Sequence, residues 1–237
     1  PFGHSVKVDG QTGRVLPKRS IKKTLALLRE LPIYRKLIWK YRRAGKPGLS
    51  NLDDALCVPF SDFAKTHRVT NLMSELALFF TGFGYDYFER IPAVYVLKYY
   101  RWPTLKSFLG RNIYRLPGGI QHLWTAVASA HDVRLNTTII NIERSEVVQV
   151  TTSAGVEEFD LLIIASPLDE ALNYLDASIK EQELFSKIKY VDYCTIACSV
   201  EGIVDGDGYV PSNFTPIRAG HPVFWHHRHP DTRVYTF

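Results

Sequence analysis

The sequence predicts an α+β fold in which helices and strands fall into separate blocks, with one β segment inserted between them. Residues 1–115 have mostly helical patterns, whereas residues 189–237 contain short strand signals. Between them, residues 116–168 contain three consecutive strand signals. The last, EEFDLLIIASP at 157–167, is almost continuously apolar, which is typical of a strand buried on both faces of a layered α/β sheet. We therefore expect a helical plus mixed β-sheet domain that is interrupted by part of an α/β domain.

The first block begins with a hairpin signal and continues with a basic helix. The segment VKVDGQTGRVLP at 6–17 contains Asp-Gly and Thr-Gly pairs, which favour tight turns. Apolar residues then recur at helical spacing over 20–45. Pro32 lies inside this pattern, and we expect it to break or kink the helix.

Further helices are indicated by their start and stop signals. Ser61 is predicted to cap a short helix. A longer helix is predicted over 70–80 and should end at Gly82 and Gly84, because glycine favours helix termination. Pro92 fits the first turn of the helix AVYVLKYY that follows it.

The inserted segment and the late block continue the pattern. A Pro-Gly-Gly turn at 117–119 precedes an apolar-periodic helix, followed by strand signals at 133–143 and 147–155. Another helix is predicted over 180–188. The late strand signals are YCTIACSVE (193–201), GYVPSN (208–213) and PVFWHHRH (222–229).

Composition and length are those of an ordinary globular protein. The 237 residues are 46% hydrophobic and 22% charged, and no apolar run reaches the roughly 18 residues of a transmembrane helix. Three cysteines do not indicate a disulfide framework in a chain of this length. The sequence begins at Pro1, has Met73 as its only methionine and stops within a strand signal. We expect it to be a piece of a longer protein, cut at both ends.

Basic residues are concentrated near the N-terminal end. The formal net charge is +5, and residues 1–48 contain 13 Lys or Arg against only Asp9 and Glu30. Since apolar residues lie between them at helical spacing, this basic block can lie on an anionic membrane surface. The simpler interpretation is a solvated helix face that packs on its own domain. We expect no nucleic-acid partner, because no zinc finger or aromatic RNA-binding signature accompanies the charge.

Several ordered motifs resemble a known family. Residues 58–100 contain an aromatic-Gly-Tyr turn followed by Pro-Ala-x-Tyr-Val-Leu-Lys-Tyr, and residues 116–168 run from LPGGIQHL to FDLLIIASPL. Together they resemble the flavin amine oxidase superfamily, and most closely its polyunsaturated fatty acid double-bond isomerases. The likeness implies FAD as the cofactor of the full-length protein, held by a domain of the NAD(P)-binding Rossmann-like kind. The glycine-rich dinucleotide fingerprint is missing, so the chain would be a fragment without the pyrophosphate-binding unit.

The resemblance also divides the chain and implies functional residues. Its domains would be the helical part of a substrate domain (1–115), the distal part of an FAD-binding domain (116–168) and the β-sheet part of the substrate domain (169–237). Phe83 and Phe108 match positions that wall the substrate channel, although either could be an ordinary core residue. The cofactor-binding positions would be Gly118, Gly119, Ile139, Ala165, Ser166 and Pro167. Each of these could instead be a simple turn or strand residue, and no catalytic residue is assigned.

Departures from the family pattern restrict the chemistry. Amine oxidases often place a lysine near the flavin on the strand that corresponds to 193–201, but no lysine is available near Ile196. The fatty acid isomerases anchor the substrate carboxylate with an arginine just before the first hairpin, where this chain has PFGHSVK and no arginine before Arg14. Either the anchor lies upstream or the substrate has no such carboxylate.

A histidine cluster does not indicate a metal site. His226, His227 and His229 lie close together, yet no nearby carboxylate or cysteine completes a set of zinc ligands. Solvent-facing strand residues or the rim of a substrate cleft explain them better, so we expect no bound metal.

Three functions remain in competition. The first is a truncated FAD-dependent oxidoreductase or isomerase that acts by hydride transfer on a hydrophobic substrate, such as a lipid or polyunsaturated fatty acid. The fragment alone is expected to be inactive. The second is an amine or carotenoid oxidoreductase of the same superfamily. The third is a non-enzymatic module that binds a membrane or a partner through the basic N-terminal block, and the compartment stays open between the cytoplasm and a membrane surface.

Overall fold

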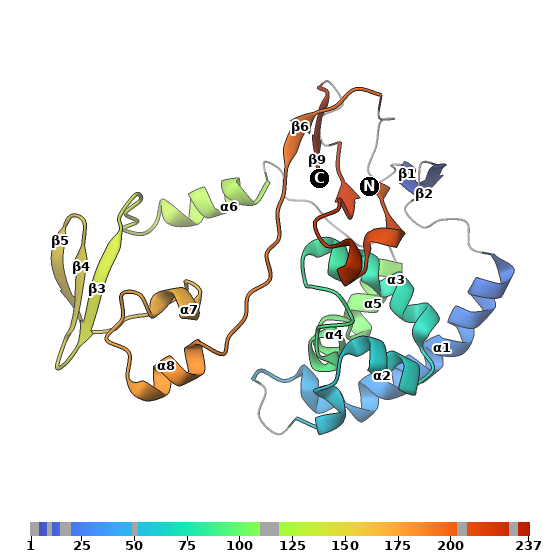
Figure 1. Ribbon diagram of the computed structural model, residues 1–237, viewed down its shortest axis with the longest axis horizontal. Coiled ribbons are helices and arrows are strands. Elements are labelled where there is room, and N and C mark those ends of the chain that lie inside the picture. The colour runs from blue at the N-terminus through green and yellow to red at the C-terminus, as the bar shows by residue number, and fades with distance from the viewer. Residues whose placement is uncertain are drawn as a thin grey trace. The chain divides into compact units, whose positions relative to one another are not determined.

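The computed structural model describes residues 5–8, 11–14, 20–48, 52–109, 119–202, 208–227 and 232–237. The chain divides into two compact units (Figure 1). The first unit combines Pro1–Tyr114 with Val191–Phe237, and the second unit is Arg115–Tyr190. Helices and small sheets are both present, so the predicted α+β fold class is confirmed.

The first unit is built mainly from helices. In chain order these are α1 (Ile21–Lys40), α2 (Phe60–Thr66), α3 (Thr70–Phe80), α4 (Ala93–Tyr99) and α5 (Trp102–Leu109). Short 3₁₀ turns join them: η1 (Arg42–Gly45), η2 (Asp54–Leu56) and η3 (Thr81–Phe83). Helix α3 has the predicted bounds, and Pro92 is the N-cap of α4. None of the described helices is both long and apolar enough to cross a bilayer.

Helix α1 continues through Pro32, so of the predicted break or kink the break was wrong. Its N-terminus is capped by Ser20, whose hydroxyl accepts a hydrogen bond from the Lys23 amide at 3.2 Å. Pro32 removes only the amide that would bond to the Leu28 carbonyl. Because Pro32 and Leu28 are both on the exposed side of the helix, water can satisfy that carbonyl.

Helix α2 starts differently from the prediction. Ser61 was expected to be its cap, but the helix begins at Phe60 and no side chain caps it. Instead, the Phe60 amide donates to the Ile91 carbonyl and the Ser61 amide to the Phe88 carbonyl, both at 2.9 Å. The prediction was wrong because backbone from a later segment satisfies the first amides of the helix, and this leaves Ser61 buried.

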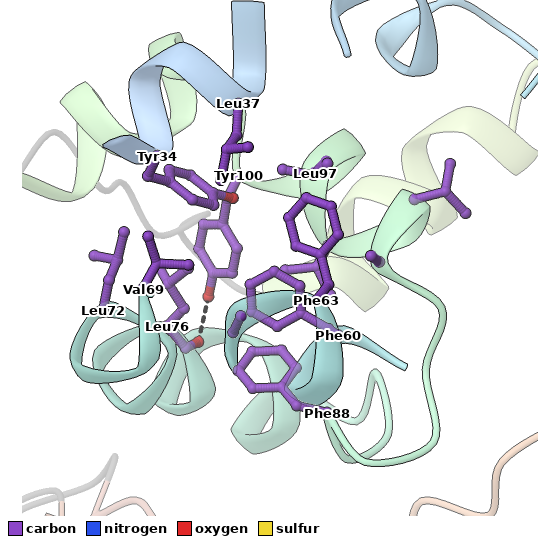
Figure 2. Close-up of a cluster of buried hydrophobic side chains, with 14 of the residues drawn as sticks. Tyr34, Leu37, Phe60, Phe63, Val69, Leu72, Leu76, Phe88, Leu97 and Tyr100 are labelled. Atoms are coloured by element: carbon purple, nitrogen blue, oxygen red, sulfur yellow. Dashed lines mark hydrogen bonds between the residues drawn. The ribbon is translucent and has the colours of Figure 1, made fainter. Parts of the chain in front are cut away.

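The helices enclose an aromatic-rich core. Figure 2 shows Tyr34 and Leu37 of α1 pointing into the same cluster as Phe60, Phe63 and Tyr100. The Tyr100 phenol donates to the Leu76 carbonyl oxygen at 2.5 Å, which ties the end of α4 to α3.

A buried carboxylate fixes the start of α3. Glu30 of α1 accepts hydrogen bonds from the Leu72 amide at 2.7 Å and from the Asn71 amide and side chain. These amides belong to the first turn of α3 and have no partner within the helix. Glu30 therefore acts as a cap supplied from another helix.

The β part of the first unit is a small mixed sheet and a two-stranded ribbon. Its strands are β1 (Ser5–Val8), β2 (Gln11–Arg14), β6 (Ala197–Ser199), β7 (Gly208–Tyr209), β8 (Phe224–Trp225) and β9 (Val234–Thr236). The sheet has the order β2-β1-β7-β8, with β1 parallel to β7 and the other pairs antiparallel, while β6 pairs with β9. The hairpin and the mixed sheet agree with the sequence analysis, although the late strands are shorter than their signals.

The second unit contains a three-stranded antiparallel sheet of order β3-β4-β5. Its elements are α6 (Gly119–Ala128), β3 (Ile139–Arg144), β4 (Val148–Thr152), β5 (Gly155–Phe159), α7 (Leu168–Ala171) and α8 (Ile179–Phe185). Its small core contains Ile142, Val150 and Leu175.

The end of the second unit lies later in the chain than the domain division suggested by resemblance. Residues 169–190 were assigned to the substrate domain, but they pack with the inserted segment. Arg144 at the end of β3 bonds Asp176 at 2.6 Å and Glu181 at 2.7 Å, and Glu181 also completes a capping box with Ser178. These ion pairs hold α8 against the sheet.

The apolar run 161–165 does not form the predicted strand. Leu162 and Ile164 pack against the core of the second unit, whereas Leu161 and Ile163 are 76% and 80% exposed. No described residue pairs with this run as a strand neighbour, so only one of its faces is covered. The prediction of burial on both faces was therefore wrong for the described chain.

Candidate substrate surface and cofactor edge

The sequence FTGFGY folds into a tight turn that presents Phe83. Helix α3 passes into η3, and Gly84 then adopts a left-handed conformation with φ +85°. The Gly84 amide donates to the Thr81 carbonyl and the Tyr85 amide to the Phe80 carbonyl, both at 3.1 Å. This hydrogen-bonded reversal needs glycine, because side-chain residues rarely adopt such a φ.

Tyr193 holds this turn from a distant part of the chain. Its phenol donates to the Gly82 carbonyl oxygen at 3.0 Å. A Cβ atom on Gly84 would lie 2.6 Å from Cδ2 of the Tyr193 ring, so the ring lies directly against the glycine backbone. Partial burial raises the pKa of the Tyr193 phenol above its ordinary value.

An aromatic turn surface surrounds Phe83. We define it by Phe79, Phe83, Tyr85, Tyr193 and Phe214. The Phe79 and Phe83 ring centroids are 6.0 Å apart, and Phe214 lies over Gly82. The side chains of Phe83 and Tyr85 are each 48% exposed, so neither ring belongs to the buried core.

This aromatic turn surface is suited to contact with an apolar molecule rather than to proton transfer. The rings of Phe79, Phe83 and Phe214 offer an apolar chain flat contact area, and of the two phenols the Tyr193 hydroxyl is already bonded to backbone. Beneath it, Tyr85 packs against Phe80 and Tyr99 with centroid distances of 5.2 Å and 5.1 Å. Burial raises the pKa of the Tyr99 phenol, with a smaller contribution from Tyr85. The surface can therefore bind and orient a hydrophobic molecule.

Phe108, the other predicted wall residue, lies in α5 of the same unit. Its side chain is outside the described part of the structure. Leu105, one turn earlier in α5, is buried in the helical core, so the helix itself is anchored. The structure thus places both predicted wall residues in the first unit, and the wall role of each stays a prediction.

The predicted cofactor positions all belong to the second unit. Gly119 is the first residue of α6 and has φ +78°, while Gly118 lies outside the described residues. No described residue lies within 4 Å of a Cβ built on Gly119, so within the described chain its backbone is open to a close approach.

Ile139 begins β3, an edge strand of the three-stranded sheet. On its outer edge, β3 makes backbone hydrogen bonds at Ile142, which donates to Tyr174 at 2.7 Å and accepts from Asp176 at 3.0 Å. Ile139 precedes this pairing and is 41% exposed. An edge strand offers the backbone amide and carbonyl groups that a purine edge requires.

Ala165, Ser166 and Pro167 form the turn before α7, with Pro167 as its N-cap. The Ser166 hydroxyl is 2.6 Å from the Tyr174 phenol. The structure therefore brings an exposed edge strand, an open glycine and this turn into one unit. The role of these residues at a cofactor stays a prediction. The sequence contains no G-x-G-x-x-G motif, which would bind a pyrophosphate.

Tyr193 is the residue that sequence reasoning missed. It lies 111 residues after Gly82, and no periodicity or motif in VDYC connects it with the earlier turn. The histidines also take ordinary packing positions: the His226 ring lies 4.3 Å from Phe224, and the His227 ring stacks on Tyr235 at 4.4 Å. His229 is outside the described residues.

Comparisons with known proteins identify the family of the chain. The family model for flavin containing amine oxidoreductases matches residues 40–236. A crystal structure of the CLA-producing fatty acid isomerase from P. acnes matches with a TM-score of 0.88 and 27% identity. The match covers 98% of this chain and 57% of the isomerase chain, so this sequence spans little more than half of that protein. A comparison with curated protein sequences gives no significant match.

Proposed function

Because the chain belongs to the flavin-containing amine oxidoreductase family, we propose that it forms part of an FAD-dependent oxidoreductase or isomerase with a hydrophobic, lipid-like substrate. The observation that carries this proposal is the aromatic turn surface, where the exposed Phe83 stands between Gly82, whose carbonyl accepts from Tyr193, and the left-handed Gly84. The similarity to a fatty acid isomerase over nearly the whole chain supports the same substrate class.

The reaction would move a hydride from an activated carbon of the substrate. FAD, when bound, supplies the hydride acceptor. In isomerisation an allylic C–H bond breaks and the same hydride returns to another carbon, so no net oxidation occurs. In oxidation the two electrons pass on to an external acceptor. Phe83 would hold the acyl chain at a constant distance and angle, on which hydride transfer depends steeply.

The second unit would supply one edge of the cofactor site. Gly119 would permit close backbone approach, and the backbone of Ile139 would pair with the adenine edge. The turn of Ala165, Ser166 and Pro167 would lie near the phosphates and ribose. These assignments follow from the family resemblance, and the exposure of Ile139 and Gly119 supports them.

Helix α6 of the second unit exposes an apolar face. This supports the proposal that a further part of a flavin domain packs against this unit. Helix α6 has no buried residue, and its apolar stripe is largely exposed: Ile120 59%, Leu123 41%, Trp124 60% and Val127 40%. A helix of 10 residues is marginal in water without tertiary packing. We propose that the rest of the flavin domain covers this stripe and binds the pyrophosphate.

Amine oxidation is the second candidate, since the matching family model is named for it. The position expected for the flavin-side lysine is near Ile196, whose backbone pairs with Phe237 in both directions at 2.9 Å. The absence of a lysine there disfavours amine oxidation. A non-enzymatic module has no support from the family match.

Full-length flavin-loaded protein tests the proposal. We expect a flavin absorption spectrum and, with a polyunsaturated fatty acid under anaerobic conditions, either conjugated-diene absorbance or bleaching of the flavin. A primary amine should produce neither signal. A colourless folded protein, or bleaching by amines alone, would contradict the proposed function.

A further inference from the structure

Helix α1 has two apolar faces on opposite sides. Its inner face carries Tyr34 and Leu37, which are 0% and 7% exposed and point into the helical core (Figure 2). Its outer face carries large apolar side chains in water: Ile21 is 80% exposed, Leu25 50%, Leu28 62% and Trp39 70%. A helix that merely packs on its own domain needs only the inner face.

The exposed apolar residues form one stripe. Spaced at 3.6 residues per turn, Ile21, Leu25, Leu28 and Trp39 fall within a sector of about 60° around the helix axis. Figure 1 shows α1 as a long helix along the outside of the helical part of the first unit. We call this stripe, together with the basic rows described next, the outer face of α1.

Basic residues flank the stripe on both sides. Lys22, Arg29 and Lys36 recur every seven residues and make one row. The other row is Arg35 of α1 with Arg42 of η1, which lies over the Trp39 ring. All five residues are exposed. Acidic residues do not offset this charge, because Glu30 is the only one in α1 and it is buried at the start of α3.

Trp39 provides a membrane-type anchor on this face. The Arg42 guanidinium carbon lies 5.0 Å from the Trp39 ring centroid, and Nη1 of Arg42 donates to the Trp39 carbonyl at 3.3 Å. An indole beside a cation suits the boundary between lipid headgroups and acyl chains, where one part of the ring is apolar and the other is hydrated.

The position of Pro32 and the flanking basic charge favour a bilayer over a dry protein groove as the occupant. Pro32 leaves the Leu28 carbonyl without its helical partner, and both residues are on the outer face. A dry protein groove would have to satisfy this carbonyl, whereas the hydrated headgroup layer supplies water to it.

We propose that the outer face of α1 is a docking surface for an anionic lipid bilayer. The apolar stripe enters the headgroup boundary, and the two basic rows contact acidic headgroups on either side. The helix then lies in the plane of the surface. This inference rests on the geometry of α1 and does not depend on the reaction proposed above.

Vesicle co-sedimentation with the flavin-loaded full-length protein tests it. The probes are vesicles of phosphatidylcholine alone and of phosphatidylcholine mixed with phosphatidylserine. We expect binding to the mixed vesicles at low salt and much weaker binding at high salt, because surface charges are screened beyond about 10 Å at 0.1 M salt. No binding at low salt, or equal binding to both vesicles, would overturn the proposal.

Substitutions on the outer face localise the binding. Arg29→Glu with Lys36→Glu should weaken binding to the mixed vesicles by about 10-fold or more, given the strong contribution of each basic residue near an acidic surface. The matched control, Lys187→Glu with Lys189→Glu, makes the same charge change on exposed residues of the second unit and should leave binding unchanged. An equal loss in both pairs would show non-specific charge attraction and overturn the assignment to α1.

A second pair of variants tests the apolar stripe, with a matched control pair elsewhere in the chain. Leu25→Gln with Leu28→Gln should weaken binding by about 10-fold or more, since two leucines no longer enter the boundary. Ile179→Gln with Ile217→Gln removes residues that are 85% and 92% exposed elsewhere and should have no effect. Circular dichroism checks that each variant is folded. Quenching of tryptophan emission by bromine-labelled mixed vesicles should fall in Trp39→Phe, and unchanged quenching would contradict the docking geometry.

Discussion

The Tyr193 phenol donates a hydrogen bond of 3.0 Å to the Gly82 carbonyl oxygen, which lies 111 residues earlier in the chain. The same ring lies against Gly84. Phe83 stands between these glycines, so Tyr193 contacts the backbone on both sides of the proposed wall residue. The position of Phe83 therefore depends on a segment that returns from the second unit.

Gly84→Ala should destabilise the protein through two separate effects. The left-handed φ of +85° is unfavourable for alanine, and its Cβ would displace the Tyr193 ring. We expect a loss of about 2–4 kcal/mol in the free energy of unfolding. Gly220→Ala is the matched control, because Gly220 has the same φ but nothing within 4 Å of its Cβ. It should cost about 1–2 kcal/mol. Equal losses in denaturant unfolding would show that the Tyr193 contact contributes nothing.

Phe83→Ala should lower enzymatic turnover strongly and the free energy of unfolding only slightly. Since Phe83 is 48% exposed, its truncation leaves no enclosed cavity, whereas the control Phe60→Ala, at 0% exposure, should cost about 3–5 kcal/mol. In the flavin-loaded full-length enzyme we expect Phe83→Ala to reduce turnover by about 10- to 100-fold with unchanged flavin content. Phe108→Ala should behave in the same way. Unchanged turnover in a stable, flavin-loaded variant would remove the wall assignment for that residue.

Acid should weaken the link between β3 and α8. Hydrogen bonds from Arg144 and then from Ser178 lower the pKa of Glu181 below its ordinary value. Because the pKa of Glu181 is lower in the folded state than in the unfolded state, the ionised carboxylate stabilises the folded protein. This stabilisation is complete above the pKa of the unfolded state, about 4.3, and is lost as the pH falls below that value. Melting temperature measured from pH 7 downward should therefore fall at acidic pH, and this fall should be smaller in Glu181→Gln. The control Glu183→Gln, which breaks only an exposed pair with Lys187, should resemble wild type. If both variants keep the wild-type profile, Glu181 is not responsible.

The chain of 237 residues should bind FAD weakly by itself. The glycine-rich turn that holds the pyrophosphate does not occur in the sequence, and the described residues are proposed to supply only one edge of the cofactor site. Titration of FAD, followed by flavin fluorescence, should show little binding, whereas the full-length protein should retain flavin through purification. Micromolar binding by these residues alone would contradict the assignment.

Sequence patterns predicted correctly those elements that depend only on residues nearby in the chain. The α3 helix was predicted correctly because its apolar spacing and the terminating glycines Gly82 and Gly84 act within one segment. The Ser61 cap was wrong because carbonyls of Phe88 and Ile91 satisfy the amides instead. Likewise, the apolar run 161–165 signals burial, yet burial depends on covering layers that its own residues do not specify.

The candidate site was predictable only in part. Phe83 could be named because the resemblance rests on its own motif, FTGFGY. Tyr193 could not be named, since the hydrogen bond to Gly82 arises from the tertiary fold. The outer face of α1 was visible as basic and apolar spacing, but only the structure shows that its opposite face already fills the core.

A deuterium-transfer experiment tests the central claim most directly. Flavin-loaded full-length protein is mixed anaerobically with a polyunsaturated fatty acid deuterated at the carbon between its double bonds, and the product is analysed by mass spectrometry. We expect deuterium to leave this carbon, either to reappear on another carbon of the same chain or to accompany flavin bleaching. A fatty acid recovered unchanged, with its label in place, from an enzyme that oxidises a primary amine would contradict the proposed reaction.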